Sequence, residues 1–453
     1  MFFKTTMIAA ALVSVATMAR ADVAAGDACA ANLTADGKRV LMIHGDEFDT
    51  VVTNHHINTW FGDWCYDLLL ASGRVRAQGT PTADQVIQGK DPRLIVHNSR
   101  TGVLETPLEL LREHERTPKE ILFIRNNQVL PQGKTLEPIA PDGWIISIEG
   151  MVENAQAFDA KILKDLPQVE VEMVLQCSGN GRSFFARAQR ASGTQWKHGG
   201  MGNVVFKGVP FKVLVEHLKL NIYPGAKYVT VNGKDQPPTL QAPDFEHSVP
   251  LEEALEKGIL ALEMNGEPLP AAHGGPVRFV MPGFYGTMNV KWVDRIRFDV
   301  AETFNHNQIP RYRVPNHPIQ PGSEFNFTFE NSRPNWHQKV KSVIFAPLDG
   351  EEVKAGNVLV RGVAWNDGLV PIEAVLGSTD QGRTWIRAKL TSPQSPYAWF
   401  HWETYVALPR GGRGSWVRAV DKLGRAQPLD GTVHWNPRGY EWNGVDIVKV
   451  KVV

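Results

Sequence analysis

The sequence reads Met173-Val-Leu-Gln-Cys-Ser-Gly-Asn-Gly-Arg-Ser-Phe-Phe185 where an apolar run ends in a glycine-rich turn. The run from Val169 to Leu175 predicts a buried strand that ends at Cys177. Glycines in the turn let a ligand approach the backbone closely, and Arg182 lies five residues after the thiol. A thiolate binds soft or high-valent metal centres well, whereas a buried cysteine is often only a small core residue. The stretch alone leaves both interpretations open.

Length and composition bound the fold class. The 453 residues predict two or three domains, and 43% hydrophobic with 21% charged residues is typical of a globular protein. Lys and Arg together number 48, as do Asp and Glu, so no overall charge points to nucleic acid or to an anionic membrane surface. Any anion-binding site must therefore be local.

Residues 1–21 have the pattern of a secretory signal peptide. Lys4 precedes the short apolar stretch Met7–Met18, and Ala19-Arg-Ala21 fits a small-x-small cleavage site. The stretch is shorter than the roughly 20 residues that span a bilayer. It contains no Arg-Arg pair, so a twin-arginine route is not indicated. We predict cleavage and a periplasmic location; an uncleaved amphipathic start is the alternative.

Three cysteines occur, at positions 29, 65 and 177. In an exported protein an odd count leaves one thiol for another role. The simplest partition is a Cys29–Cys65 disulfide with Cys177 left as a ligand, although sequence cannot show that the first two are close enough to bridge. The chain contains no Cys-x-x-Cys-His motif, so we predict no haem attached to it.

Residues 22–85 are a leader of unknown role, and residues 86–300 are predicted to form an α+β domain. In the leader, Val40–Ile43 predicts a strand, Tyr66–Ser72 a helix, and His55-His56 a surface segment, because adjacent residues do not share a face. In the domain, strands and helices mix without a βαβ rhythm. From Pro92 the chain is expected to be an extended arm that includes Leu94–Arg100. The strands expected are Glu120–Asn127, Trp144–Ile148, Val204–Phe206 and Tyr228–Val231; the helices are Phe158–Leu166, Phe211–Leu218 and one that starts at Thr106-Pro107.

The last third of the chain has a different pattern. Residues 301–335 are polar and contain proline, which is typical of a linker. From residue 336 to 453, short alternating strands recur with turns every eight to twelve residues and no helix between them. This spacing predicts an immunoglobulin-like β-sandwich.

Basic residues recur at strand or loop ends of the central domain, beside Gly, Asn or Trp. A protein builds a pocket for a phosphorylated or oxyanionic ligand in this way, with arginine supplying forked hydrogen bonds. One cysteine cannot hold a metal alone, so the other ligands would come from a cofactor. The residues are Arg125, Arg182, Lys197, His198, His273, Arg278 and Lys291.

Five motifs in order resemble the sulfite oxidase family of molybdenum enzymes, and the likeness runs from about Leu94 to the C-terminus. They are Cys177-Ser-Gly-Asn-Gly-Arg182, Trp196, Glu263-Met-Asn-Gly-Glu-Pro-Leu-Pro270, His273-Gly-Gly-Pro-Val-Arg278 and Val290-Lys-Trp292. The resemblance implies a molybdopterin-binding domain followed by an immunoglobulin-like dimerisation domain, and therefore a homodimer.

The resemblance also implies roles for individual residues. The thiolate of Cys177 would bind molybdenum, which a pterin dithiolene also holds. The residues that would contact the pterin are Phe123, Ile124, Arg125, Asn126, Asn127, Asp235, His273, Arg278, Asn289, Val290 and Lys291. Those that would form the substrate pocket are Arg125, Arg182, Trp196, Tyr312 in Pro310-Arg-Tyr-Arg313, and Arg438 in Trp435-Asn-Pro-Arg-Gly439.

The activity implied is oxidation of sulfite to sulfate. Guanidinium groups in a partly dry pocket would hold the oxygens of this small dianion. The leader lacks the His-Pro-Gly-Gly signature of the family's cytochrome b5-like domain. The electron acceptor is therefore expected to be a separate protein such as a cytochrome c.

Other interpretations stay open. Asn127 stands where many relatives have His, and an amide cannot carry charge. A sulfane dehydrogenase acting on carrier-bound sulfur is one alternative, and a non-catalytic relative that keeps the fold is another. Individual residues have plainer roles too: core ion pairs for Arg125 and Arg182, core packing for Trp196, an exposed position for Tyr312, an interface contact for Arg438, and a structural or surface role for His198.

Overall fold

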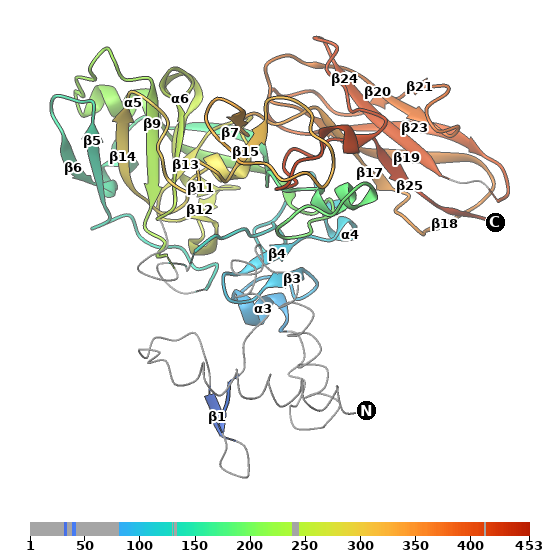
Figure 1. Ribbon diagram of the computed structural model, residues 1–453, viewed down its shortest axis with the longest axis horizontal. Helices are drawn as coiled ribbons and strands as arrows, with labels where there is room; N and C mark the ends of the chain where they lie inside the picture. Colours follow the sequence, from blue (N-terminus) through green and yellow to red (C-terminus); the bar gives the residue numbers. More distant parts are fainter. Residues whose placement is uncertain are drawn as a thin grey trace, which may run out of the picture. The chain divides into compact units, whose positions relative to one another are not determined.

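The computed structural model describes residues 31–33, 39–41, 81–128, 130, 134–237, 244–411 and 414–453. The chain divides into a unit of residues 1–78 and a unit of residues 79–453. In the first unit, β1 (Ala31–Leu33) and β2 (Arg39–Leu41) pair antiparallel (Figure 1). The predicted signal peptide lies outside the described residues, as do Cys29, Cys65, His55-His56 and the helix expected over Tyr66–Ser72.

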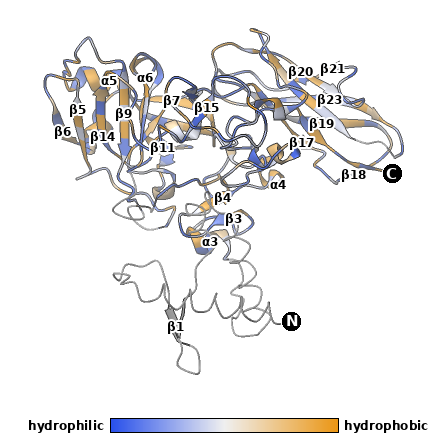
Figure 2. Ribbon diagram, viewed as in Figure 1, coloured by the Kyte–Doolittle hydropathy of each residue, from blue (hydrophilic) through white to orange (hydrophobic). Residues whose placement is uncertain are grey.

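One five-stranded sheet of the second unit has the order β10-β9-β14-β5-β6. Only the β14–β5 pair is parallel. Two helices pack beside the sheet, and Phe211 at the start of the first lies against the rings of Phe279 and Phe298. Apolar residues recur along these elements (Figure 2). The elements are β5 (Ile145–Gly150), β6 (Gln156–Asp159), β9 (Tyr228–Gly233), β10 (Glu246–Pro250), β14 (Val293–Asp299), α5 (Phe211–His217) and α6 (Leu251–Lys257).

A second sheet carries the stretch around Cys177. Its order is β12-β11-β8-β7, with β13 also paired to β11. The expectation of a fully buried strand before Cys177 is wrong for its first half, because Val169 is 42% exposed and only Met173–Gln176 are buried. In this first half of the strand, Glu170 is exposed and Glu172 is half-buried. The strands are β7 (Val169–Gln176), β8 (Met201–Pro210), β11 (Ile259–Met264), β12 (Glu267–Pro268) and β13 (Arg278–Val280).

The strand expected over Glu120–Asn127 does not form. The segment is a turn followed by irregular backbone, and only Ile124 makes an isolated bridge, to Leu104. Its apolar residues enter two different cores: Ile121 and Ile124 pack in one, Leu122 and Phe123 in the other. Preceding it are α3 (Ala83–Val86), β3 (Ile95–Asn98), β4 (Val103–Glu105) and the single turn α4 (Leu108–Leu111), which Pro107 caps.

Short 3-10 helices shape the loops. The helix expected over Phe158–Leu166 is shorter than predicted, because Phe158 belongs to β6 and a 3-10 helix begins at Ala160. Asp159 caps that helix by accepting a hydrogen bond from Lys161 N. The 3-10 helices are η3 (Ala160–Asp165), η4 (Arg182–Arg187), η5 (Ala271–His273), η6 (Gly286–Met288) and η7 (Gly431–His434).

The segment 301–335 is packed in part: residues 312–314 are buried, whereas residues 316–318 and 320–322 are exposed. It contains the antiparallel pair β15 (Arg313–Pro315) and β16 (Ser332–Pro334). Arg313 is 1% exposed and pairs with Glu302 at 2.6 Å. Tyr312, just before β15, is also buried. Its polar composition therefore reflects buried hydrogen bonding as much as solvent exposure.

Residues from 341 onward form the predicted immunoglobulin-like sandwich. Two four-stranded sheets, β17-β19-β23-β22 and β21-β20-β24-β25, enclose an apolar core that includes Val360, Trp402 and Val417. A short parallel pair, β18–β26, lies at its edge. The strands are β17 (Lys341–Ala346), β18 (Glu352–Val353), β19 (Gly356–Trp365), β20 (Ile372–Ser378), β21 (Ile386–Arg387), β22 (Lys389–Leu390), β23 (Phe400–Leu408), β24 (Ser415–Asp421), β25 (Asp446–Val448) and β26 (Lys451–Val452).

The sandwich and the residues just before it contact β7 directly. Gln338 donates from Nε2 to Val174 O at 2.9 Å, and Trp365 donates from Nε1 to Gln176 Oε1 at 3.1 Å. Both acceptors lie within three residues of Cys177. The α+β domain and the β-sandwich predicted from the sequence are thus confirmed, and they meet beside the cysteine. Among the described helices, none is long and apolar enough to cross a membrane.

Candidate active site

Cys177 follows β7 and faces the loop that precedes β8. Its N–H donates to Gly200 O at 2.8 Å, and its own carbonyl accepts from Asn180 N at 2.9 Å. The β7–β8 pairing continues to Gln176 opposite Met201, so the loop before Met201 must fold back beside the cysteine. The side chain is 8% exposed.

Two arginines act on the ionisation of this thiol. Burial raises the pKa of Cys177, while the Arg125 and Arg182 guanidiniums and the Gly179 N–H oppose that rise. A positive environment favours the thiolate, which is the form that binds a metal. Among the described residues, no group of three or more His, Cys, Asp or Glu side chains is arranged to hold a metal ion.

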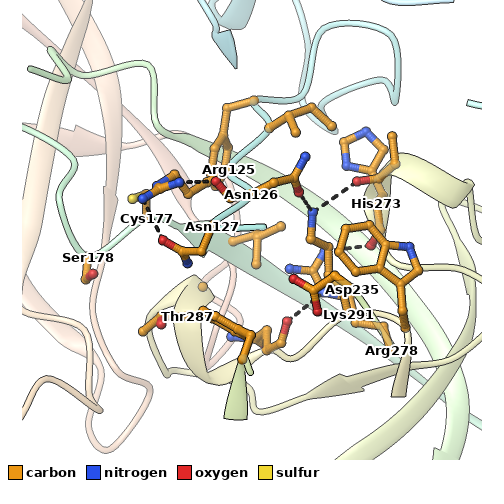
Figure 3. A pocket seen from close by; sticks show the side chains of 18 of the residues that line it. Arg125, Asn126, Asn127, Cys177, Ser178, Asp235, His273, Arg278, Thr287 and Lys291 are labelled. Atoms are coloured by element: carbon orange, nitrogen blue, oxygen red, sulfur yellow. Dashed lines mark hydrogen bonds between the residues drawn. The ribbon is translucent and has the colours of Figure 1, made fainter. Parts of the chain in front are cut away.

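A pocket opens beside Cys177 and is built from segments far apart in the chain (Figure 3). It encloses about 670 Å³ of space between atoms, counting its mouth. Ten of the eleven residues predicted to bind a cofactor line it; the exception is Val290, which is 2% exposed and packs in the core. The ten are Phe123, Ile124, Arg125, Asn126, Asn127, Asp235, His273, Arg278, Asn289 and Lys291.

Sequence reasoning missed several lining residues. Ser178 directly follows the cysteine, Thr287 lies in η6, and Phe245 precedes β10. A hydroxyl or a ring inside an ordinary stretch carries no signal that distinguishes it from its neighbours. Only the convergence of the segments identifies these residues.

Buried cations dominate one end of the pocket. Lys291 donates to Asn126 Oδ1 and to Ala272 O, and Arg278 donates from Nε to Asn289 O at 3.0 Å. Burial lowers the pKa of Lys291, and the positive charge of Arg278 adds to that effect. Burial also lowers the pKa of Arg278, to about 9. These cations need an anionic partner to be stable in this setting.

Among the described residues that line the pocket, Asp235 is the only acidic one. Burial raises the pKa of Asp235, while the Lys291 ammonium opposes the rise. Outside the lining, Lys90 adds another buried cation: it is 2% exposed, and its Nζ lies 3.4 Å from His273 Nε2. Burial lowers the pKa of Lys90 well below its usual range. Sequence reasoning did not single out Lys90, which is far from every motif.

At the end near Cys177, one asparagine joins an arginine to a tyrosine. Arg125 donates from Nη2 to Asn127 Oδ1 at 2.7 Å. Asn127 Nδ2 and Tyr312 OH are 2.9 Å apart, and Tyr312 OH and Asn127 Oδ1 are 3.0 Å apart. Figure 3 shows Arg125 and Asn127 beside the sulfur. Asn127 is therefore a neutral bridge that fixes two polar groups at the pocket wall.

Three residues predicted for the substrate pocket are not among the described residues that line the pocket beside Cys177. Arg182 donates from Nε to Arg438 O and from Nη1 to Thr194 O, both at 2.7 Å. The backbone carbonyl of Arg438 thus helps to hold the Arg182 guanidinium. Neither residue is among those that line the pocket. Trp196 is fully buried, with its ring centroid 5.9 Å from that of Phe123. Of the three arginines predicted for the substrate pocket, Arg125 is the one found among the described residues that line this pocket.

His198, for which a structural or surface role was expected, lies against the second domain. Its Nε2 is 3.0 Å from Asp446 Oδ1 at the start of β25. Burial raises the pKa of Asp446, but the contact with His198 and further hydrogen bonds outweigh it and keep that pKa low. The role of His198 is therefore structural.

Comparison with known proteins identifies both domains. Residues 133–307 match the family model of the oxidoreductase molybdopterin binding domain, and residues 332–452 match that of the Mo-co oxidoreductase dimerisation domain. Mitochondrial sulfite oxidase of Homo sapiens is 31% identical over 384 residues, which cover 82% of this chain and 68% of that protein.

Two further similarities agree with these matches. Mitochondrial sulfite oxidase of Macaca fascicularis is 32% identical over 371 residues, 79% of this chain and 65% of that protein, so this chain spans about two thirds of its length. The crystal structure of the sulfane dehydrogenase SoxCD from Paracoccus pantotrophus superposes with a TM-score of 0.63 at 24% identity, covering 83% of this chain and 94% of that one. The latter likeness concerns the fold.

Proposed function

Since this chain belongs to the sulfite oxidase family and is a molybdenum-containing oxidoreductase, we propose that it oxidises sulfite to sulfate at a molybdopterin cofactor beside Cys177. Electrons would leave to an external acceptor such as a cytochrome c. The observation that carries the proposal is the position of one buried thiol between Arg125 and a cationic pocket.

The residues present fit this cofactor. Arg278, Lys291 and Lys90 bring buried positive charge to a pocket whose described lining residues include a single carboxylate, so an anionic occupant would stabilise them. A pterin carrying a phosphate is such an occupant. Asn126, Asn289 and the backbone around η5 and η6 supply the neutral hydrogen-bonding groups.

Each group then has a physical role. When bound, the cofactor supplies the metal centre at which the sulfur of the substrate loses two electrons. Cys177 would hold the metal from the protein side, and Arg125 and Arg182 favour its thiolate. Arg125 binds the anionic oxygens of the substrate, and Asn127 and Tyr312 keep its guanidinium in place. Arg182 is not among the lining residues and acts through its positive charge, which favours the Cys177 thiolate.

The wider setting is part of the proposal. A signal-like start of the chain supports export to the periplasm, where an external one-electron acceptor would meet the enzyme. The match to a dimerisation domain supports a homodimer.

Two measurements test the proposed activity. Purified protein from molybdenum-supplied cells should contain about one molybdenum per chain, the stoichiometry of a single bound cofactor. It should also reduce cytochrome c when sulfite is added. Protein without molybdenum would exclude the enzyme, and a molybdenum-loaded protein that ignores sulfite but oxidises carrier-bound sulfur would identify a sulfane dehydrogenase instead.

Replacing Asn127 with histidine should make substrate affinity depend on pH. An imidazole has a pKa near 6.5, and the neighbouring Arg125 should lower it, so the new side chain gains a positive charge only in acid. The ratio of KM for sulfite between N127H and wild type should fall roughly two- to fivefold from pH 8 to pH 5.5, the size of a partly exposed charge pair.

Asn127→Gln is the matched control, because glutamine cannot titrate and its KM ratio to wild type should stay constant with pH. The ionisation of sulfite changes the KM of both enzymes equally at a given pH, so its effect cancels in the ratio. A constant ratio for N127H would show that this side chain does not sense the substrate charge.

A further inference from the structure

Residues 438–442, which we call the C-terminal strap, run behind the turn that follows Cys177. Glu441 N donates to Ser178 O at 2.9 Å, so the strap is bonded to the residue after the cysteine. Trp442 packs so close to Gly181 that a Cβ there would lie 2.3 Å from Trp442 Cδ1. The strap and the Cys177 turn therefore cannot move independently.

The strap also holds Arg182. Arg438 O accepts from Arg182 Nε, and the Arg182 guanidinium lies 5.2 Å from the Tyr440 ring centroid. The Tyr440 ring stacks on Tyr312 at 5.2 Å with an interplanar angle of 21°. Gly439 has no room for a side chain, since a Cβ would lie 2.5 Å from Arg182 Cγ. One short segment thus supports both Arg182 and Tyr312.

A forked ion pair between the partly exposed Arg333 and the buried Glu441 anchors the strap. Arg333 donates to both carboxylate oxygens of Glu441, at 2.9 and 2.7 Å, and Glu441 is 5% exposed. Arg333 lies in β16, opposite Val314 of β15, and Tyr312 directly precedes β15. Lys339 Nζ is 3.6 Å from the same carboxylate. The pair thus ties the strap to the strand ribbon that carries Tyr312.

The backbone on both sides of this contact is in an unusual conformation. Glu441 has φ +61° and Tyr312 has φ +50°. Residues with a Cβ avoid this left-handed region, and such strain persists only where the surroundings hold it in place. The Arg333 fork and the Tyr312–Tyr440 stack are contacts of this kind.

We propose that the Arg333–Glu441 ion pair is a positioning device for the active site, with Glu441 as its central positioning residue. It fixes the strap, and through the strap the Ser178 carbonyl, the Arg182 guanidinium and the Tyr312 ring. The second domain thereby completes the site of the first. The activity measurements below rest on the proposed oxidation of sulfite, whereas the exchange measurement does not.

The test compares the full-length, cofactor-loaded enzyme with R333Q, E441Q and the double variant. Loss of the fork should release Glu441, so amide hydrogen exchange in a peptide covering residues 438–442 should become about tenfold faster or more. The value of kcat/KM for sulfite should fall roughly ten- to a hundredfold, as small displacements of reacting groups do. The double variant should be no worse than the worse single variant, because both remove one interaction.

R425Q is the matched control. Arg425 forms an equally forked pair with Asp367 at 2.6 and 2.8 Å, with similar exposure, but the pair lies within the sandwich domain and Arg425 does not line the pocket. This variant should lower the melting temperature, leave kcat/KM within about twofold of wild type and leave the strap peptide unchanged. Arg333→Lys, which keeps one charged contact, should recover part of the loss seen in R333Q.

The outcomes separate the two proposals. Unchanged exchange in R333Q and E441Q would overturn the positioning role, as would an equal loss of kcat/KM in R425Q. A wild-type enzyme that binds molybdenum but does not oxidise sulfite would overturn the proposed function alone, and the exchange data would still decide the role of the ion pair.

Discussion

Cys177→Ser should abolish turnover while the protein stays folded. Serine has nearly the same size, but its hydroxyl stays protonated near neutral pH and is a poor ligand for a soft or high-valent metal. A single protein ligand to the metal would be lost, so we expect kcat to fall by at least about a thousandfold, more than the 10- to 100-fold that loss of a residue supporting a ligand costs. Sulfite-dependent cytochrome c reduction measures this directly.

The same variant separates a ligand from a core residue. Placing a hydroxyl at this buried position should cost only about 1–3 kcal/mol of unfolding free energy. Circular dichroism and thermal melting would therefore show a folded chain, and metal analysis would show reduced or altered molybdenum. Near-normal turnover in C177S would mean that Cys177 is the small core residue that its sequence context also allows.

Arg182→Met should lower kcat/KM for sulfite roughly a hundredfold, the scale of losing preorganised electrostatic support in an active site. Methionine is similar in length and flexible enough to fill the space. The positive charge that favours the Cys177 thiolate would disappear, and the carbonyls of Arg438 and Thr194 would lose their donors. Each unsatisfied carbonyl costs about 1–3 kcal/mol, so the melting temperature should fall as well.

Arg187→Met is the control on the same 3-10 helix. Arg187 is exposed and lies over the ring of Phe184, 5.9 Å from its centroid. Its replacement should change kcat/KM by less than about twofold and leave stability within about 0.5 kcal/mol, as for most surface substitutions. Equal losses in the two variants would show that Arg182 contributes no more than any cation on η4.

Sequence patterns predicted secondary structure correctly where neighbouring residues alone decide it. Alternating residues and turns of the last third predicted the β-sandwich, because a half-buried sandwich strand repeats every two residues. The apolar run over Ile121–Ile124 predicted a strand that does not form. Its side chains enter two cores, and a run of apolar residues does not say how many cores it meets.

Interactions between distant segments could not be predicted in this way. Lys90 reaches His273 across 183 positions, and Arg333 reaches Glu441 across 108. Neither residue stands in a motif, and a lysine or arginine in a mixed segment is normally a surface charge. Arg438 is a different case: its motif predicted a guanidinium in the pocket, and the structure adds a backbone role, because its carbonyl accepts a hydrogen bond from Arg182.

The sequence by itself determined the chemical groups: one thiol at the end of a strand, glycines that leave room beside it, and basic residues at loop ends. These are local properties, and they sufficed for the family and the two-domain fold. Tertiary structure alone decided which of the groups meet. It placed Arg125, but not Arg182, among the residues that line the pocket, and it brought the strap of the second domain to the Cys177 turn. Long-range packing and charge pairing between distant segments set those positions, and neither leaves a period or a motif in the chain.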